Sequence, residues 1–332
     1  MEVRRGQKLK LLYIIEILMH NTDENHPMSA QEICNRLDEY GVSAERKSIY
    51  SDIEHLINFK YDIIYTRVPK PGYFLGSRDF ETPEIYLLCD AIRTAKFITP
   101  KKSRELVQKL QNMLSVHQMA GLETGLYIAS DLKCRNEEIF YSIDAISRAI
   151  AEKKKISFRY GVHTLNEKRE IVTKYRQHII SPYAQTWQDD HYYLIGNYEK
   201  YDNIVHFRID RIRSVAILDQ KSRPFSEVSE YKDVFDVADY TKGLFNMFGG
   251  KVENIELRCE ISLLEQIIDR FGMDIYVRNV TDTHFSFSVN AVPSEAFITF
   301  VMNFGNRIEI KSPQYLREKI LNRASEIQKI YQ

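Results

Sequence analysis

Cysteine is scarce in this chain and never occurs in a pattern typical of a metal ligand set or a cross-link. The sequence has four cysteines in 332 residues and no CxxC pair, which argues against a zinc site or a disulfide framework. The nine histidines show no metal-ligand spacing either. We therefore expect no metal, no cofactor and thiols that stay reduced.

Long hydrophobic runs are also missing. No stretch approaches the ~18 uninterrupted apolar residues that indicate a membrane span. The apolar N-terminal run up to Met19 is interrupted by Lys10 and Glu16 at helical spacing, and no small-residue cleavage site follows it. The sequence predicts a cytoplasmic protein that has no membrane partner.

The chain has no net charge, because 46 lysines and arginines balance 46 aspartates and glutamates. A protein that bound nucleic acid over its whole surface would be strongly basic. Any contact with nucleic acid must therefore come from a local basic patch.

The common catalytic signatures GxGxxG, GxxxxGK[ST], HExxH and GxSxG do not occur in the sequence. We therefore expect that the chain is not an enzyme. The alternative is an unusual nuclease, in which Asp189, Asp190 and Asp210 are the candidate metal ligands.

Three amphipathic helices are predicted near the N-terminus. Apolar residues recur at helical spacing through residues 7–20. Ser29 opens a second helix, with Glu32 three residues later as in a capping box, and Gly41 ends it. A third helix is predicted over residues 44–58. Because only about four residues join the second helix to the third, the pair is a candidate helix-turn-helix.

Two short strands, at residues 61–67 and 73–75, flank a tight turn and predict a wing within a DNA-binding domain of residues 1–78. Residues 1–77 carry 10 basic and 11 acidic side chains, so one copy would bind DNA weakly and a homodimer is expected. The alternative is a helical core whose charges form a solvated face. The predicted DNA contacts are Arg46, Lys47, Ser48, Tyr50 and Ser51 on the third helix and Arg67 and Lys70 on the wing.

A helical connector is predicted over residues 79–135, with helices at 84–97 and 103–117. Residues 136–220 begin with a helix at 139–153 and continue as short strands separated by turns. Five strands after one helix predict a small, strongly bent antiparallel barrel. The strands are expected at residues 156–160, 178–180, 191–195, 205–209 and 215–218, with a hydrophilic loop at 161–176.

A polar linker is predicted over residues 221–250. Residues 251–332 follow with the order strand, helix, strand, strand, helix, strand and a long final helix. That order is ferredoxin-like. The fold class is therefore α+β, with several domains.

Aromatic and arginine residues gather in residues 178–215, which contain the only tryptophan, five tyrosines and three arginines. Aromatic faces and guanidinium groups together suit a planar, anionic ligand. Strand alternation places Arg208 on the same side as His206. The same alternation requires that one of Tyr192 and Tyr193 is structural.

Several motifs resemble those of the bacterial WYL-domain transcriptional regulators, and the likeness covers essentially the whole chain. Tyr192-Tyr193-Leu194 stands where that family has Trp-Tyr-Leu, and Ser181-Pro182-Tyr183 precedes it at the family's usual distance. Phe207 to Ile212 resembles the family's F-R-x-D-R-I, and residues 304–317 resemble the extension that commonly follows. Lys47 to Ile53 resembles an R-T-[IV]-x-R-D-I pattern, with Ser51 where an arginine is common.

The resemblance implies a winged helix-turn-helix, a small Sm/SH3-like β-barrel that senses a ligand, and a ferredoxin-like extension. It further implies a regulator that binds a double-stranded DNA operator and responds to a nucleic-acid or nucleotide effector. The alternative is an accessory protein whose barrel binds RNA or a protein partner, without sequence-specific DNA binding. By position, Tyr193, Arg208 and Arg211 would line the effector site beside Ser181 and Tyr183, and Arg159, His178 and Trp187 are further candidates.

Overall fold

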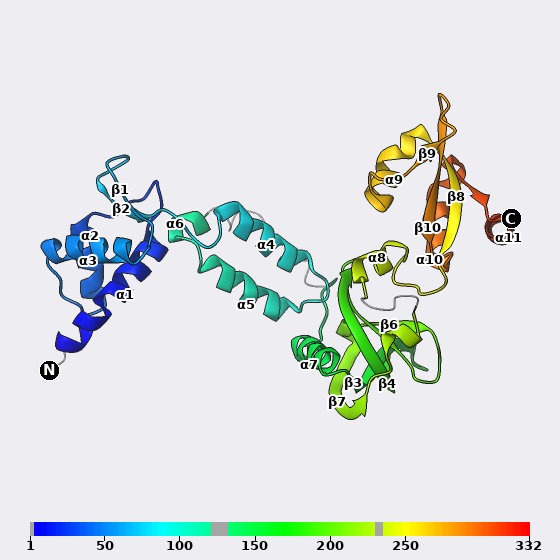
Figure 1. Cartoon of the computed structure of the whole chain (residues 1–332), viewed down its shortest axis with the longest axis horizontal. Coiled ribbons are helices and arrows are strands. Elements are labelled where there is room, and N and C mark those ends of the chain that lie inside the picture. Colours follow the sequence, from blue (N-terminus) through cyan, green and yellow to red (C-terminus); the bar gives the residue numbers. More distant parts are fainter. Residues whose placement is uncertain (1–2, 121–131, 230–234) are drawn as a thin grey trace. The chain divides into compact units, whose positions relative to one another are not determined.

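The computed structural model of the chain forms two compact units, Met1–Glu137 and Glu138–Gln332, which are described separately (Figure 1). The structure describes residues 3–120, 132–229 and 235–332. Residues 121–131 of the predicted connector and 230–234 of the predicted linker lie outside the described residues.

The first unit begins with helices α1 (Val3–Asn21), α2 (Ala30–Glu39) and α3 (Arg46–Asn58). Strands β1 (Ile63–Thr66) and β2 (Gly72–Leu75) then form an antiparallel pair. The predicted capping box is confirmed, since the Ser29 side chain accepts from the Glu32 backbone and the Glu32 carboxylate accepts from Ser29. The helices and the strand pair share one core, which contains Ile14, Leu18, Ile33, Leu37, Ile49, Ile53 and Leu75.

The predicted connector contains α4 (Thr82–Thr94), α5 (Pro100–Gln111) and the short α6 (Val116–Met119). Pro100 stands at the start of α5, where its missing N–H costs no helical hydrogen bond, and Thr99 caps the helix. The predicted helix at 103–117 ends earlier, at Gln111, and the chain turns before α6. Ile85, Cys89, Val107 and Leu114 give this pair of helices a small core of its own.

A polar joint links the loop after α1 to the start of α6. The buried Asp23 carboxylate accepts from the Ser115 hydroxyl at 2.8 Å and from the Asn25 backbone at 3.0 Å. Its other contact is His26 Nδ1 at 2.7 Å, and the His26 ring stacks on His117 with 3.7 Å between centroids. Burial opposes the charge of Asp23, but these hydrogen bonds outweigh it and lower the pKa of the carboxyl.

The second unit begins with α7 (Ile139–Ala151), followed by β3 (Lys154–Leu165), β4 (Ile171–Gln188), β5 (His191–Asn197), β6 (Ile204–Arg208) and β7 (Ile212–Lys221). These strands form one antiparallel sheet in the order β6-β5-β4-β3-β7. The prediction of a barrel is wrong in one respect, because no pairing of β6 with β7 closes the sheet within the described residues. The 3-10 turn Ile209–Arg211 separates those two strands.

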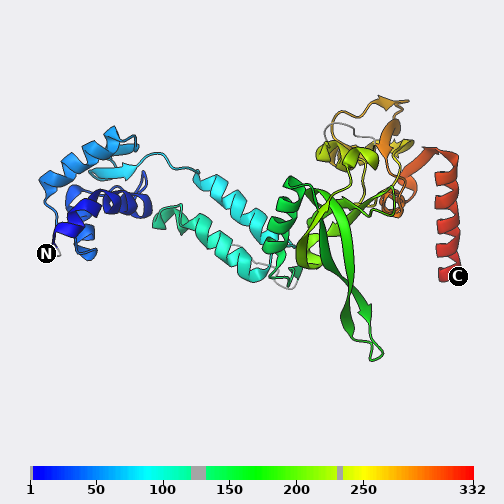
Figure 2. The ribbon, with the colours of Figure 1, turned by 60° about the horizontal axis from the view of Figure 1, so that its bottom comes forward.

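The predicted loop at 161–176 is also wrong, because most of its residues belong to β3 and β4. The two strands pair from Ile156 with Ile180 to Leu165 with Ile171, and only residues 166–170 form a turn. Figure 2 shows this hairpin, in green, extending beyond the rest of its sheet. Both of its faces are largely exposed, so the segment lacks the alternation of apolar and polar residues that marks a half-buried strand.

The C-terminal part has the element order predicted from the sequence. Its strands are β8 (Glu253–Glu260), β9 (Val277–Arg278), β10 (His284–Ala291) and β11 (Ile308–Ser312), arranged as β11-β8-β10-β9 with antiparallel pairing. Helices α9 (Leu264–Phe271), α10 (Glu295–Met302) and α11 (Gln314–Tyr331) complete it. Leu257, Ile267, Phe287 and Phe297 lie in its core.

Within the part of the chain that the structure describes, every helix is too short or too polar to cross a bilayer.

The polar joint leads to a prediction about the first unit. Asp23→Ala removes the acceptor for Ser115, Asn25 and His26, and we expect a loss of about 1–3 kcal/mol in the free energy of unfolding. A carboxyl whose pKa is lowered in the fold adds stability above its unfolded pKa, and that contribution disappears as the pH falls through the folded value. Urea unfolding should therefore separate wild type from variant clearly at pH 7 and much less at pH 3.

The matched control is Glu24→Ala, which removes an exposed neighbouring carboxylate. Hydrogen exchange should show faster opening at residues 14–26 and 115–119 in Asp23→Ala only. Equal stability losses in the two variants at pH 7 would contradict the role of the joint.

Candidate nucleic-acid interface and effector site

The start of α3 presents an exposed polar surface. Ile49 and Ile53 hold the helix in the core of the first unit, which leaves the intervening side chains directed to solvent. Of the predicted DNA contacts on this helix, those that are exposed are Arg46, Lys47, Tyr50 and Ser51. They offer two positive charges and two hydroxyl groups over the first two turns.

Aromatic contacts join α3 to the β1–β2 hairpin. The Tyr50 ring lies 6.4 Å from the Tyr73 ring, and Tyr73 lies 5.1 Å from Tyr65, measured between centroids. Tyr73 also exchanges two backbone hydrogen bonds with Met28, just before α2. The helix and the hairpin therefore form one continuous surface.

Two of the predicted DNA contacts already have partners within the chain. Ser48 Oγ receives a hydrogen bond from Lys10 Nζ at 3.3 Å and donates to the Glu45 carbonyl at 2.9 Å. Lys70 Nζ lies 2.6 Å from the carboxylate of Glu32 in the capping box of α2. Of the two basic residues predicted on the hairpin, Arg67 is exposed and Lys70 is committed to this ion pair.

In the second unit, antiparallel pairing of β5 with β6 places Tyr193 directly opposite Arg208 and Ile195 opposite His206. Directly paired residues project from the same face of a sheet, so these four side chains share one face. Phe207, which follows His206, is buried with the aromatic residues of the opposite face. The predicted pair of Tyr193 and Arg208 is therefore brought together.

Arg208 binds a carboxylate of its own chain. Its Nε lies 3.1 Å from Asp210 Oδ1 and its Nη2 lies 2.7 Å from Oδ2, a two-point contact. Burial disfavours the charged guanidinium, but the hydrogen bonds and charge of Asp210 outweigh it and raise the pKa of Arg208. Nη1 takes no part in the bonds to Asp210, so it can donate to an anion on the other side of the guanidinium group.

The face that carries Tyr193 is covered by a segment of the chain itself, residues 235–248, which we call the covering segment. Helix α8 (Val237–Lys242) lies within it. Leu244 and Met247 of this segment pack in one buried cluster with Tyr193 and Ile195, and Tyr193 retains only 8% exposure. The predicted effector residue is therefore almost closed to solvent.

A second set of contacts extends the cover along the sheet. Ring centroids lie 4.9 Å apart for Tyr183 and Phe225, 4.1 Å for Phe225 and Phe235, and 5.3 Å for Phe235 and Tyr240. Tyr240 then bonds His206, with 3.0 Å between its hydroxyl and Nε2. Tyr183 and His206 are thus bridged by aromatic residues that follow the sheet in sequence.

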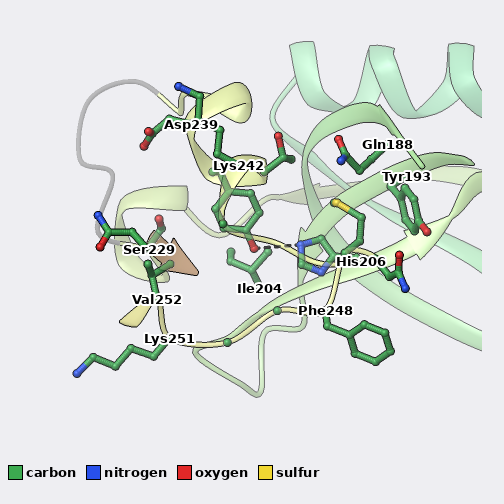
Figure 3. A pocket seen from close by; sticks show the side chains of 18 of the residues that line it. Gln188, Tyr193, Ile204, His206, Ser229, Asp239, Lys242, Phe248, Lys251 and Val252 are labelled. Atoms are coloured by element: carbon green, nitrogen blue, oxygen red, sulfur yellow. Dashed lines mark hydrogen bonds between the residues drawn. The ribbon is translucent and has the colours of Figure 1, made fainter. Parts of the chain in front are cut away.

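Burial controls the protonation of His206. It lowers the pKa of the imidazole to about 4, against a smaller opposing effect of a hydrogen bond with the Met247 backbone. His206 is therefore neutral at neutral pH, and both of its known partners, Tyr240 and Met247, belong to the covering segment. Figure 3 shows His206 and Tyr193 among the residues that line the groove described below, with the hydrogen bond of His206 drawn as a dashed line.

An open groove of about 2040 Å³ lies between this face of the sheet, the covering segment and the C-terminal part. Its walls come from β5 and β6, from the covering segment and the residues after it, and from α9 and β10. The groove has room for a ligand as large as a short oligonucleotide, since pockets for drug-sized ligands span about 300–1,000 Å³. Its cationic side chains are Arg208, Lys242, Lys251 and Arg270, and its acidic ones are Asp202, Asp239 and Asp274.

The other predicted effector residues do not join Tyr193 and Arg208 in one site. His178 lies on the opposite face of the sheet, where its ring contacts Phe158 and Phe207 and it bonds the Tyr198 hydroxyl. Burial lowers the pKa of His178, helped by the charge of Arg176. These contacts make His178 part of the structural core.

The remaining candidates have separate surroundings. Ser181 is buried and accepts the backbone N–H of Arg223 at 2.9 Å. Burial raises the pKa of Tyr183 to about 12. Trp187 is half exposed beside Tyr192, its partner in the register. Arg159 is exposed on the β3–β4 hairpin, and Arg211 is half-buried in the turn after β6.

The sequence did not identify His206, Tyr240 or Met247 as members of this site. For His206 a signal existed, because strand alternation places it beside Arg208. Tyr240 and Met247 lie in a stretch without periodicity, and nothing local indicates which face they cover.

The predicted alternative of a metal-dependent nuclease finds no metal site among the described residues, where no three His, Cys, Asp or Glu side chains are gathered in a ligand arrangement. Asp189 and Asp190 form the two-residue turn between β4 and β5, both with positive φ, and Asp210 binds Arg208.

Comparison with known families identifies two segments of the chain. Residues 142–217 match the WYL domain, and residues 251–328 match the WCX domain. The first match contains β3 to β6 and much of β7, and the second contains the β8–β11 sheet. No curated protein matches the chain.

Two solved structures are similar over most of the chain at low identity. Proteasome accessory factor B/C (PafBC) of Arthrobacter aurescens shares 14% identity and aligns over 94% of this chain and 47% of that one, with a TM-score of 0.27. The chain thus spans about half the length of that relative. A CRISPR Cas-related protein shares 14% identity over 97% of this chain and 84% of that one, with a TM-score of 0.25.

The motif Tyr192-Tyr193-Leu194 lies inside the first matched segment, and the extension expected after it coincides with the second. The resemblance inferred from these motifs is confirmed for these segments: the chain contains a WYL domain and, after it, a WCX domain.

Proposed function

We propose that this protein is a DNA-binding transcriptional regulator that acts as a homodimer and whose WYL domain senses a nucleic-acid or nucleotide effector. The observation that carries the proposal is the presence, on one chain, of an exposed basic helix start at α3 and a WYL-domain groove lined by Arg208. One part suits a DNA groove, and the other suits an anionic ligand.

The first unit supports DNA binding through its geometry. The order of α2, α3 and the β1–β2 hairpin fits a winged helix-turn-helix, in which the second helix of the pair enters the major groove. Arg46 and Lys47 at the start of α3 would then meet bases or phosphates, and Arg67 would meet the backbone from the hairpin. With Lys70 paired to Glu32, few cations remain for each copy, which favours two copies on one operator.

The groove supports an anionic effector. Nη1 of Arg208 can donate a hydrogen bond to a phosphate oxygen, and a base can stack on an aromatic ring for about 1–3 kcal/mol. Tyr193 is the ring closest to Arg208 in the register, but the covering segment packs on it. We infer that an effector that stacks on Tyr193 displaces the covering segment.

The DNA-binding proposal predicts that Arg46→Ala with Lys47→Ala lowers operator affinity at least ~10-fold at 100 mM salt, since each lost phosphate or base contact costs about 1 kcal/mol or more. The operator is first selected from a random duplex pool with the wild-type chain. Binding is then measured by fluorescence anisotropy.

A matched control for this test is Lys101→Ala with Lys109→Ala, which removes two exposed cations from α5 and should leave affinity unchanged. If the α3 variant binds as tightly as wild type, or if no duplex is enriched, the accessory-protein alternative is favoured.

For the effector site, two substitutions should act in opposite directions. Arg208→Ala removes the anion-binding fork and should weaken binding of nucleotides and short single-stranded oligonucleotides at least ~10-fold. Asp210→Asn removes the competing carboxylate charge and should strengthen binding. Isothermal titration of the same ligands measures both.

Arg159→Ala serves as the control, because Arg159 lies on the exposed hairpin and outside the groove lining. Equal affinities for wild type, Arg208→Ala and Asp210→Asn would exclude Arg208 from the site.

A pH prediction follows from His206. Its pKa falls from about 6.5 in the unfolded chain to about 4 in the fold, so the unfolded chain binds more protons between these values. The contribution of His206 to stability is therefore complete above pH 6.5 and declines as the pH falls toward 4. Hydrogen-exchange protection factors of residues 235–248 should decrease over this window.

In His206→Gln, the imidazole is replaced by a polar amide of similar size that does not titrate. The protection factors of this segment should therefore change much less between pH 6.5 and 4. The same decline in the variant as in wild type would show that another group controls the covering segment.

A further inference from the structure

The β3–β4 hairpin, residues 159–176, leaves its sheet as a two-stranded arm, which we call the arm. On β3, pairing with β7 reaches no further than Tyr160, and on β4, pairing with β5 begins only at Ser181. Both edges of the arm are therefore unpaired from Gly161 to Tyr175 within the described structure. Figure 2 shows it in green, projecting away from the strands of its sheet.

The arm is basic in a chain that has no net charge. Residues 159–176 contain five lysines and arginines and two glutamates. The ion pairs found among the described residues include none of the five cations. Each of them is exposed, and they are Arg159, Lys168, Arg169, Lys174 and Arg176.

Hydrogen bonds between Asn166 and Glu170 order the turn at the tip of the arm. The Asn166 side chain bonds the Glu170 backbone N–H at 2.9 Å and the Glu170 carboxylate at 2.9 Å. The Asn166 backbone N–H also donates to the Glu170 carbonyl at 3.0 Å. The tip carries Lys168 and Arg169 beside Glu167 and Glu170, so the net positive charge of the arm comes from Arg159, Lys174 and Arg176 on its strands.

On β4, two of the cations project from the same face of the arm. Lys174 and Arg176 lie two residues apart on β4, so they point from one face about 7 Å apart. Val162 and Tyr160 stand opposite them in the register. On the other face, the Arg159 guanidinium lies 5.4 Å from the centroid of the Tyr175 ring. The Tyr175 ring packs over Gly161, where the Cβ of any larger residue would lie 3.0 Å from Tyr175 Cε1.

Charge decides what kind of partner the arm fits. Pairing with the arm of a second copy would bring together two surfaces that each carry five cations and only two glutamates, a net charge of plus three on each. A polyanion matches both the sign and the spacing, since duplex DNA carries a phosphate about every 3.4 Å along each strand. A two-stranded β-ribbon also has the width of the major groove.

We propose that the arm binds the phosphate backbone of duplex nucleic acid, independently of sequence, at a surface separate from α3 and from the WYL groove. This proposal does not depend on the proposed operator function, because the arm would recognise phosphate charge and not bases.

The test is salt-dependent binding of the full chain to a duplex of random sequence. Lys168, Arg169, Lys174 and Arg176 are changed together to glutamine, which keeps side-chain length and removes four exposed charges. If all four contact phosphates, the slope of log K against log salt becomes shallower by about 3.6 in the variant. Between 50 and 200 mM salt, the wild type should then lose about 10²-fold more affinity than the variant. Arg159 is left unchanged because it rests on Tyr175.

A control variant changes four exposed lysines elsewhere in the second unit, Lys200, Lys221, Lys319 and Lys329, to glutamine. It has the same net charge as the arm variant and should keep a slope near that of wild type. Equal slopes for the arm and control variants would overturn the proposal, since they would show only the effect of net charge.

A second variant, Leu165→Ser with Ile171→Ser, removes the exposed apolar pair at the tip and leaves every charge in place. Random-duplex affinity should not change. If this variant loses mass in sedimentation while the glutamine variant retains duplex binding, the arm is a protein contact and the proposal is wrong. The α3 variant Arg46→Ala with Lys47→Ala should lose operator selectivity while it keeps arm-dependent binding to random duplex, so the two proposals fail separately.

Discussion

The packing of residues 235–248 on one face of β5 and β6 is the constraint on which the WYL-domain site depends. Tyr193, Ile195, Leu244 and Met247 form one buried cluster, so the aromatic ring expected to meet a ligand already has an apolar partner. The cover is fixed on its other side as well, because Arg270 donates to the Leu244 carbonyl at 2.7 Å. Direct contacts therefore link the Tyr193 face, through the covering segment, to Arg270 of the C-terminal part.

Arg208 adds an electrostatic threshold to this arrangement. Two of its N–H groups donate to Asp210. A second anion can replace that carboxylate favourably only if it carries more charge or bonds the guanidinium group in a better geometry. A neutral aromatic molecule would gain nothing at this position. For the proposed effector, this contact favours discrimination by charge before discrimination by ring stacking.

The sequence predicts the elements well where each one carries its own signal. The capping box of Ser29 and Glu32, the turn at Asp189 and Asp190, and the order of elements after residue 251 are all local patterns, and the structure contains each of them. The local patterns need no knowledge of distant contacts. The family resemblance assigns Tyr193 and Arg208 to one site, and the register of β5 and β6 pairs them directly.

Other features escaped prediction because their causes are not local. The arm is exposed on both faces and has no apolar period, so its strands resemble a loop in sequence. The ion pair of Lys70 with Glu32 joins residues 38 positions apart. The covering segment depends on tertiary packing of Leu244 and Met247, and a polar, irregular stretch gives no indication of the face that it covers.

The unpaired edges of the arm have a consequence for the solution behaviour of the protein. Free strand edges are templates for pairing with other chains, and natural proteins protect them with charged side chains. Here Lys174 and Arg176 provide that protection through mutual repulsion between copies. A polyanion that neutralises them also removes the barrier between neighbouring arms, so crowding on one nucleic acid would allow edge-to-edge pairing that the free protein resists.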